Sequence, residues 1–421
     1  MAMDNSANPE LKLPWAGKKV RQEEVENELT SFWHRAADNM RISQNMNVRT
    51  SVLNFVICAL DVESAYKASM LLRDLSSTLI ARVTLIILDT RSNAPSDTTT
   101  WVTLRSFPII SDIMRHHFEQ ITVAISGTAV HYTANIVQGL LKPDLPVYLW
   151  WLNNPPEDES ILQRLTQISS RVIVDSRDFS QPEEQIRTLS ELLQESPDCA
   201  LSDLNWEHIT AWRELIAQFF DIADYRPYLL NADHIAIEYT VPPPPEGTQT
   251  ISVAHVAKNP IGALLVGAWL KTRLGWRLSD GGDQKYHDAE SGGYTWQMHT
   301  RDITRLLSQP LLLNVQETAA QGSIHISVQP KIQAESRPGT LCMIRITGEI
   351  NGERATFIVK RSEDDSHVST AVEIAGATRL QRTVNIAATY KESNLLHHEL
   401  EIMGRDHLYE ETLHEVFALL A

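Results

Sequence analysis

The sequence predicts an α/β protein in two parts. The N-terminal part is expected to hold a doubly wound, mostly parallel sheet, and the C-terminal part to be an α+β domain with antiparallel strands. Near-continuous apolar strands alternate with helices in the first half, which is typical of a parallel sheet covered on both faces. The proline-rich run 241–247 then indicates a stiff, extended linker. Beyond it, apolar runs separated by turn residues favour antiparallel strands.

The N-terminal part is expected to begin with a helix and then to alternate strands and helices. Residues 1–48 should form a polar tail and a helix over 22–40, because apolar side chains recur there at helical spacing. Asp61 is expected to cap the helix that follows the first strand. Residues 101–110 fit an edge strand or a loop, and a long helix over 202–220 should close the domain 49–240. The expected strands are 52–60, 83–88, 121–125, 147–151 and 172–174, with a further helix over 128–141 and a short one around 161–168.

The second domain, 248–421, is expected to begin after the linker. A helix over 261–274 is apolar almost all round, so it should be buried, and Gly275 suits its C-terminal cap. Asn351-Gly352 is a strong signal for a two-residue hairpin. A helix should end the chain. The expected strands are 250–254, 294–299, 311–316, 323–329, 341–349, 354–360 and 367–374.

Composition limits the classes of partner. The chain has 421 residues, of which 43% are hydrophobic and 21% charged, as in an ordinary folded protein. Its formal net charge of -16 disfavours binding to nucleic acid or to an anionic membrane. The polar N-terminus has no apolar signal core, and the apolar stretches are too short to span a membrane. A cytoplasmic protein is the simplest interpretation.

Cysteines and histidines give little sign of redox or metal chemistry. Cys58 and Cys342 lie in apolar strands and should be buried, whereas Cys199 follows Pro197-Asp198 and is expected to be exposed. Cys199 is therefore the candidate redox residue. The adjacent pairs at 116–117 and 397–398 do not have the spacing of metal ligands, so no metal is expected.

The first strand–helix turn argues against a nicotinamide-dependent dehydrogenase. It has no glycine, and Asp61 and Glu63 would repel a pyrophosphate, so no cofactor is expected. The best candidate for anion binding is Ser126-Gly127-Thr128, where a strand meets the N-terminus of a helix. The alternative is that Ser126 or Thr128 simply caps that helix.

The run 146–156 is the most informative stretch of the chain. Its strand ends in Trp150 and Trp151, whose side chains point to opposite faces, so one of them is expected at a rim. The alternative is that both lie under the flanking helices. Aromatic residues dominate binding hot spots, and the candidate partner-binding residues are Trp150, Trp151, Asn153, Asn154, Trp206 and Arg213.

Four segments carry a resemblance to a known family. They are 13–17 (Leu-Pro-Trp-Ala-Gly), 146–151 (Pro-Val-Tyr-Leu-Trp-Trp), 203–206 with 212–221, and 399–406. Together and in this order they resemble the glucose-6-phosphate dehydrogenase assembly proteins, the OpcA family.

The resemblance implies a function that the residues alone do not give. It implies a non-catalytic protein that binds glucose-6-phosphate dehydrogenase and favours its active oligomeric state in the oxidative pentose phosphate pathway. Redox control is associated with this system, although the cysteines give it little support. The alternative is a sugar-phosphate-binding enzyme or metabolite sensor that uses the Ser126-Gly127-Thr128 turn.

Overall fold

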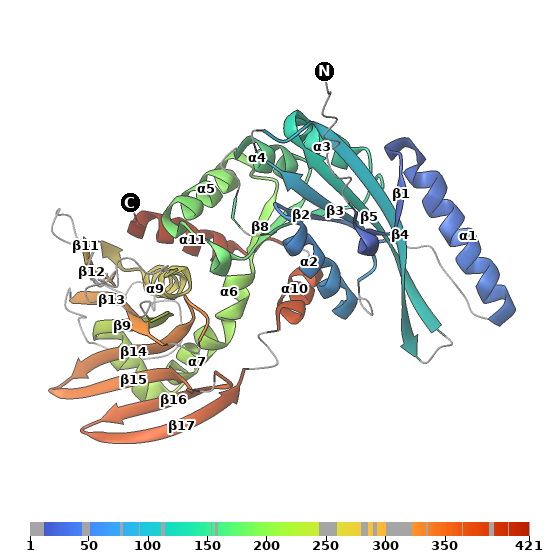
Figure 1. Cartoon of the computed structure of the whole chain (residues 1–421). Helices are drawn as coiled ribbons and strands as arrows, with labels where there is room; N and C mark the ends of the chain where they lie inside the picture. The colour runs from blue at the N-terminus through green and yellow to red at the C-terminus, as the bar shows by residue number, and fades with distance from the viewer. Residues whose placement is uncertain are drawn as a thin grey trace. The chain divides into compact units, whose positions relative to one another are not determined.

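The computed structural model separates into two compact units, which divide between Ile173 and Val174 (Figure 1). The structure describes residues 12–43, 51–75, 79–91, 93–110, 114–152, 154–155, 159–243, 259–278, 285–288, 293–299, 322–333, 336–363, 365–386, 391–402 and 404–420.

The first unit is built on a mostly parallel sheet, as the sequence predicts. Its strands are β1 (Lys18–Val20), β2 (Leu53–Ala59), β3 (Ala81–Asp89), β4 (Asp97–Ile110), β5 (Met114–Ser126), β6 (Val147–Trp151) and β7 (Arg171–Val174). They lie in the order β1-β4-β5-β3-β2-β6-β7. The pairs from β5 to β7 are parallel, whereas β4 and β1 are added antiparallel at one edge. Residues 101–110, for which the sequence allows an edge strand or a loop, are part of the long strand β4, and the short strand β1 pairs with its outer side.

Helices in the first unit follow the expected order with shifted ends. They are η1 (Pro14–Ala16), η2 (Gln22–Glu24), α1 (Val25–Ser43), α2 (Val62–Asp74), η3 (Gly127–Tyr132), α3 (Thr133–Gln138) and α4 (Glu159–Gln167). Helix α2 packs against β2 and β3, and α1 packs against β4. The Asp61 cap is confirmed, because its Oδ1 accepts the backbone N–H of Ser64 at 2.7 Å.

A buried ion pair lies within the first unit. Glu119 of β5 and Arg82 of β3 are 1% and 2% exposed, and Arg82 Nε donates to Glu119 at 2.8 Å. Trp33 of α1 donates its indole N–H to the other carboxylate oxygen, also at 2.8 Å. Because buried charges are costly unless paired and hydrogen-bonded, this cluster fixes α1 to the sheet in one geometry.

The second unit is α+β. Its helices are η4 (Ser176–Asp178), α5 (Pro182–Glu195), α6 (Leu204–His208), α7 (Thr210–Phe220), η5 (Ala223–Tyr225), α8 (Arg226–Leu230), α9 (Ile261–Leu274), α10 (Glu392–Glu401) and α11 (His407–Leu420). The buried helix α9 is confirmed, with Gly275 in the left-handed conformation at its end. It packs against β9 and β13, and α11 packs against α9 and α5.

The predicted single helix over 202–220 is wrong in two respects. Residues 200–203 form strand β8 (Ala200–Asp203), and the helical part is broken at Ile209 into α6 and α7. Asp203 explains why the helix begins only at Leu204, because its side chain caps α6 by accepting the N–H of Asn205. Helix α7 packs against β15 within the second unit, through Phe219 and Phe220 on Phe357.

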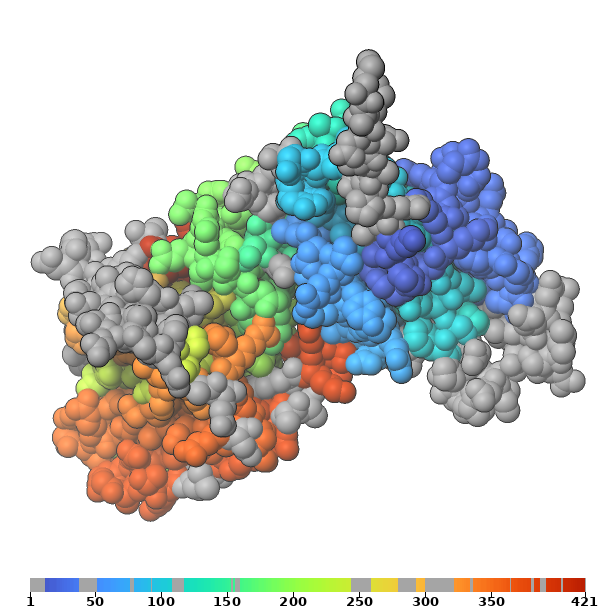
Figure 2. All heavy atoms as spheres, in the orientation of Figure 1, coloured from blue at the N-terminus to red at the C-terminus, as the bar shows by residue number. Residues whose placement is uncertain are grey.

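The sheet of the second unit is mainly antiparallel. Its strands are β9 (Ala232–Val241), β10 (Arg277–Leu278), β11 (Lys285–Asp288), β12 (Gly293–His299), β13 (Ser323–Ile332), β14 (Leu341–Ile350), β15 (Glu353–Arg361), β16 (His367–Ile374) and β17 (Ala377–Asn385). The order is β10-β12-β13-β9-β14-β15-β16-β17, with β11 beside β12. Among the described strand pairs of this sheet, only β9–β13 is parallel. Figure 2 shows the orange and red atoms of β15 to β17 as an outer surface of this unit.

Local turn chemistry and the domain limits have different outcomes. The Asn351-Gly352 hairpin is confirmed, with φ of 53° and 80° joining β14 to β15. The two compact units divide after Ile173, whereas the expected linker begins at Val241, the last residue of β9. The expected domain limits stay a prediction. The expected strands at 250–254 and 311–316 lie outside the described residues.

Candidate functional site

The tryptophan strand end is buried rather than exposed. Trp150 and Trp151 are 1% and 0% exposed, so the expectation that one of them lies at a rim is wrong. Trp150 stacks on Phe55 with ring centroids 6.2 Å apart, and the Trp151 indole N–H donates to the carbonyl of Asn154 at 2.9 Å. Both faces of this strand are covered in the core. Their role in partner binding stays a prediction that burial does not favour, and Asn153 lies outside the described residues.

Trp206 and Arg213 are brought together within the second unit. The Arg213 guanidinium carbon lies 3.5 Å from the Trp206 ring centroid, and the indole N–H donates to Asp406 at 2.7 Å. Trp206 is 3% exposed, and burial lowers the pKa of Arg213 to about 10. This arrangement is that of an internal anchor, so a partner-binding role for either residue remains a prediction.

The Ser126-Gly127-Thr128 turn is filled by the chain itself. Ser126 donates its hydroxyl to the carbonyl of Pro95 at 2.7 Å, and Thr128 hydrogen-bonds to Ser96 at 3.0 Å. Gly127 has φ of +60°, and a Cβ there would lie 2.6 Å from the carbonyl oxygen of Ala94. The expected side-chain cap is also not made by Ser126. The turn is therefore a packed corner, and its geometry does not favour anion binding.

Cys199 is buried, at 6% exposure, so the expectation that it is exposed is wrong. Its thiol lies 3.6 Å from the carbonyl oxygen of Ala200, in the turn that leads into β8. Cys58 and Cys342 are buried as predicted, and burial raises the pKa of both thiols, that of Cys342 to about 11. A redox role for Cys199 stays a prediction that burial makes less favourable.

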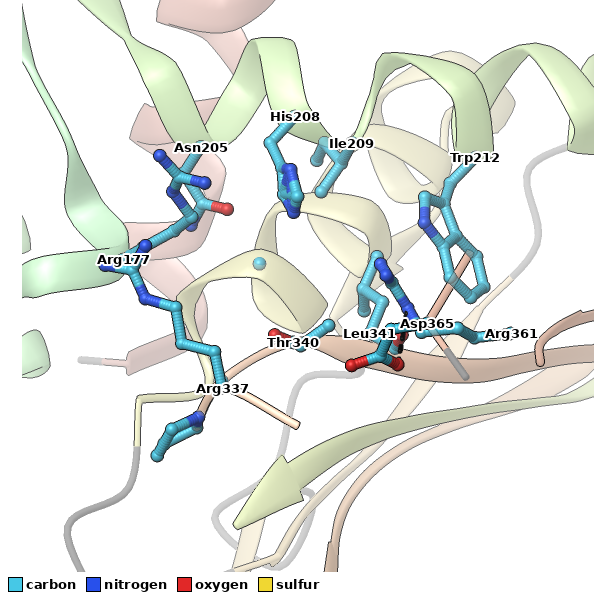
Figure 3. A pocket seen from close by; sticks show the side chains of 13 residues that line it. Arg177, Asn205, His208, Ile209, Trp212, Arg337, Thr340, Leu341, Arg361 and Asp365 are labelled. Atoms are coloured by element: carbon cyan, nitrogen blue, oxygen red, sulfur yellow. Dashed lines mark hydrogen bonds and ion pairs between the residues drawn. The ribbon is translucent and has the colours of Figure 1, made fainter. Parts of the chain in front are cut away.

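A cavity of about 330 Å³ lies within the second unit (Figure 3). Helices α6 and α7 form one wall, and Gly262 of α9 lies beside it. The other wall comes from the segment that enters β14 and from the end of β15. The lining side chains include those of Arg177, Asn205, His208, Ile209, Trp212, Arg337 and Arg361, together with Asp365.

Three arginines from distant segments line this cavity, and each is held in place. Arg177 Nε donates to both carboxylate oxygens of Asp175, at 2.8 and 3.0 Å. Arg361 Nε donates to the carbonyl of Leu341 at 2.9 Å. Arg337 forms an ion pair with Asp178 and is the most exposed of the three, with 48% of its side chain accessible. Arg177 and Arg361 are thus held by largely buried contacts, whereas Arg337 is held by an exposed ion pair.

The polar side chains of α6 complete the cavity. His208 points from α6 toward the opposite wall in Figure 3, and desolvation together with the charge of Arg177 lowers its pKa well below the usual value. The imidazole is therefore neutral at pH 7 and can donate one hydrogen bond. The Asn205 amide donates to the hydroxyl of Ser176 at 2.9 Å. These contacts hold the wall rigid.

Sequence reasoning did not single out the arginines or His208. Each lies in a different segment, and no spacing rule joins positions that only the fold brings together. The nearest local signal is the turn after Arg337, where Gly339 has φ of +81°. Among the described residues no group of three or more acidic, histidine or cysteine side chains is placed to hold a metal ion. No helix in the described ranges is long and apolar enough to cross a membrane.

The structure is that of a two-unit α/β protein with an arginine-lined cavity in its second unit. Two family models match the chain. One describes the N-terminal domain of a glucose-6-phosphate dehydrogenase subunit and matches residues 73–191, and the other describes the C-terminal domain and matches residues 199–413. The chain belongs to this family, the OpcA family, as the four sequence segments indicate.

Relatives carry the same family name. A protein of Nostoc punctiforme, named OpcA and assigned by that name to the OxPP cycle, is 26% identical over 308 residues, covering 70% of this chain and 56% of its own. Its namesake in Synechococcus elongatus is 27% identical over 297 residues, covering 70% and 58%. The chain thus spans little more than half the length of these relatives.

Solved structures resemble this chain only distantly. A biliverdin reductase from Synechocystis, in complex with biliverdin and NADP+, has a TM-score of 0.43 at 9% identity, covering 87% of this chain and 96% of its own. A 3-ketoreductase from Actinomadura kijaniata gives 0.44 at 12% identity, with the same coverages. Similarity at this level supports no conclusion about the function of this chain.

Proposed function

We propose that this chain is a non-catalytic protein that binds glucose-6-phosphate dehydrogenase and favours its active oligomeric state. The observation that carries the proposal is the match of both halves to the two domains of a glucose-6-phosphate dehydrogenase subunit. The relatives' assignment to the OxPP cycle supports a setting in the oxidative pentose phosphate pathway. A cytoplasmic location suits such a partner.

The proposed mechanism is preferential binding. A protein shifts an equilibrium between two states of an enzyme only through a difference in its affinity for them. Activation therefore requires contacts that form better with the active oligomer. The net charge of -16 suits a basic surface on the enzyme, which would also speed encounter at low ionic strength.

The first strand–helix turn supports a role other than dehydrogenase catalysis. In a dinucleotide-binding fold the N-terminal amides of this helix would face a pyrophosphate. Here the Asp61 carboxylate takes that place, accepting the N–H and the hydroxyl of Ser64, both at 2.7 Å. Partial burial raises the pKa of Asp61, but these hydrogen bonds hold it below the usual value, so the group is anionic at pH 7. A fixed negative charge there opposes a bound phosphate.

Steady-state kinetics of the same organism's glucose-6-phosphate dehydrogenase, with increasing amounts of this chain, test the proposal. We expect a saturable fall in apparent KM or rise in kcat, co-elution of the two proteins in size-exclusion chromatography, and no turnover by this chain alone. No kinetic effect and no co-elution, under oxidising and reducing conditions alike, would overturn it.

The alternative, a sugar-phosphate enzyme that uses the Ser126-Gly127-Thr128 turn, predicts the opposite pattern. The chain alone would then convert a sugar phosphate, with no need of the dehydrogenase. The hydrogen bonds of Ser126 and Thr128 to the neighbouring loop give this alternative no support.

A further inference from the structure

We propose that the arginine-lined cavity of the second unit is a binding site for a small phosphate monoester. The site is distinct from the Ser126-Gly127-Thr128 turn and does not depend on binding of the dehydrogenase. Its ligand would be a phosphorylated metabolite of the size of a sugar phosphate.

The lining of the cavity is rich in arginine. Among the described residues that line it, Arg177, Arg337 and Arg361 stand beside one carboxylate, that of Asp365. Asp175 and Asp178 pair with Arg177 and Arg337 from outside the lining, so the cavity offers an anion the remaining N–H donors of these arginines and not a net excess of positive charge. Asp365 lies 4.0 Å from Arg361 Nε, at the limit of an ion pair, and therefore compensates it weakly.

The carboxylates that pair with these arginines also orient them. A guanidinium has five N–H donors, so an arginine that holds a carboxylate can still donate to a second anion. Asp175 and Asp178 contact their arginines without being among the residues that line the cavity. They orient Arg177 and Arg337, and a planar guanidinium matches a phosphate bidentately.

The backbone at the start of α9 adds to this field. Gly262 lies in the first turn of this 14-residue helix, where the N–H groups and the helix dipole favour an anion. Gly262 lines the cavity, and an added Cβ there would lie 3.4 Å from Asn205 Oδ1 and 3.6 Å from the carbonyl oxygen of Gly339. The N–H of Ile261 already donates to Asn259 Oδ1 at 3.1 Å, so the contribution of this helix is mainly that of its dipole.

Size and surface select the ligand class. A cavity of about 330 Å³ lies at the small end of the range for ligand pockets, roughly 300–1,000 Å³. That volume suits a phosphorylated metabolite better than a dinucleotide. The Trp212 ring and Ile209 offer an apolar wall for a carbon skeleton, and the Asn205 amide can form a hydrogen bond to a hydroxyl group.

The test is calorimetric titration of the full chain with glucose 6-phosphate, inorganic phosphate and glucose. We expect saturable binding of the two phosphates, weakened by salt, and none of glucose. Arg337→Gln should weaken binding of glucose 6-phosphate about tenfold, because a charge-assisted hydrogen bond is lost. Arg354→Gln is the matched control, since Arg354 also forms an exposed ion pair, with Asp233, but lies outside the cavity. The affinity of the Arg354→Gln variant for glucose 6-phosphate should equal that of the wild type.

A second variant has an effect that misfolding cannot imitate. Asp365→Asn removes the carboxylate found among the described lining residues, and asparagine tolerates the left-handed backbone there, with φ of 55°. Binding of glucose 6-phosphate should tighten. The proposal is overturned if the wild-type chain binds neither phosphate, if Arg337→Gln and Arg354→Gln lose affinity equally, or if Asp365→Asn binds more weakly than wild type.

Discussion

Replacing Asp203 by asparagine should stabilise the second unit at neutral pH, although it removes a buried, hydrogen-bonded side chain. Asp203 is 0% exposed, and its Oδ1 accepts the backbone N–H groups of Ser176 and Asn205, both at 2.9 Å. The Tyr409 hydroxyl donates to its Oδ2 at 3.3 Å. Desolvation, with repulsion from Asp175, raises the pKa of this carboxyl to about 6.

The magnitude follows from linkage. The pKa is raised from 3.8 on folding, so the folded state binds the proton more tightly than the unfolded state. This contribution to stability is therefore present below pH 3.8 and is lost as pH rises through about 6. At about 1.36 kcal/mol for each pH unit, the loss at pH 7.5 amounts to about 3 kcal/mol.

Asparagine resembles the protonated acid. Its oxygen can accept the same two N–H groups, and its amide can donate to the hydroxyl of Tyr409. We expect Asp203→Asn to be more stable than wild type by up to about 3 kcal/mol at pH 7.5 and by about half as much at pH 5. Hydrogen exchange of amides in β8 and α6, in mild denaturant at both pH values, measures this difference. A variant less stable than wild type at pH 7.5, or a difference independent of pH, would refute the reasoning.

Three further predictions concern the first unit and the thiols. Glu119→Gln should destabilise the first unit by about 3–5 kcal/mol in denaturant titrations, because it breaks a buried ion pair, whereas Glu26→Gln at the exposed end of the cluster should cost about 1 kcal/mol or less. Gly127→Ala should lower the melting temperature more than Gly352→Ala, since both have positive φ but only Gly127 meets backbone atoms within 3 Å; equal shifts would contradict the packing argument. Cys199 should react with dithiobis(nitrobenzoate) only after unfolding, and fast reaction in the native protein would show that its burial is wrong.

The sequence predicts the elements whose signals are local. Asp61 caps a helix and Asn351-Gly352 forms a hairpin because the residues themselves determine the backbone geometry. Helix α5 was missed although Pro182 at its start, followed by two glutamates, is a recognisable helix signal. Strand β9 is not among the predicted strands. The proline-rich run that begins at its last residue indicates a linker, so the residues before it are expected at the end of the first domain.

The cavity could not be predicted in the same way. Arg177 lies in a short 3-10 helix, Arg337 in a turn and Arg361 at the end of a strand, and each alone resembles an ordinary surface arginine. Only the tertiary fold of the second unit brings them to one cavity. The tryptophans at 150–151 are the opposite case, because a conspicuous sequence pattern turned out to belong to the core. Both faces of a parallel sheet are covered, so side chains on either face of this strand are buried.

The parallel pairing of β9 with β13 has a consequence for biosynthesis. Val241 ends β9, and Ser323 begins its partner about 80 residues later, so β9 leaves the ribosome well before either of its neighbours. At roughly 5–20 residues per second, an alternating strand with an apolar face stays unpaired for about 4–16 seconds. That interval exposes a strand edge to other nascent chains. Production of the second unit should therefore depend on chaperones that shield β9 until β13 and β14 are made.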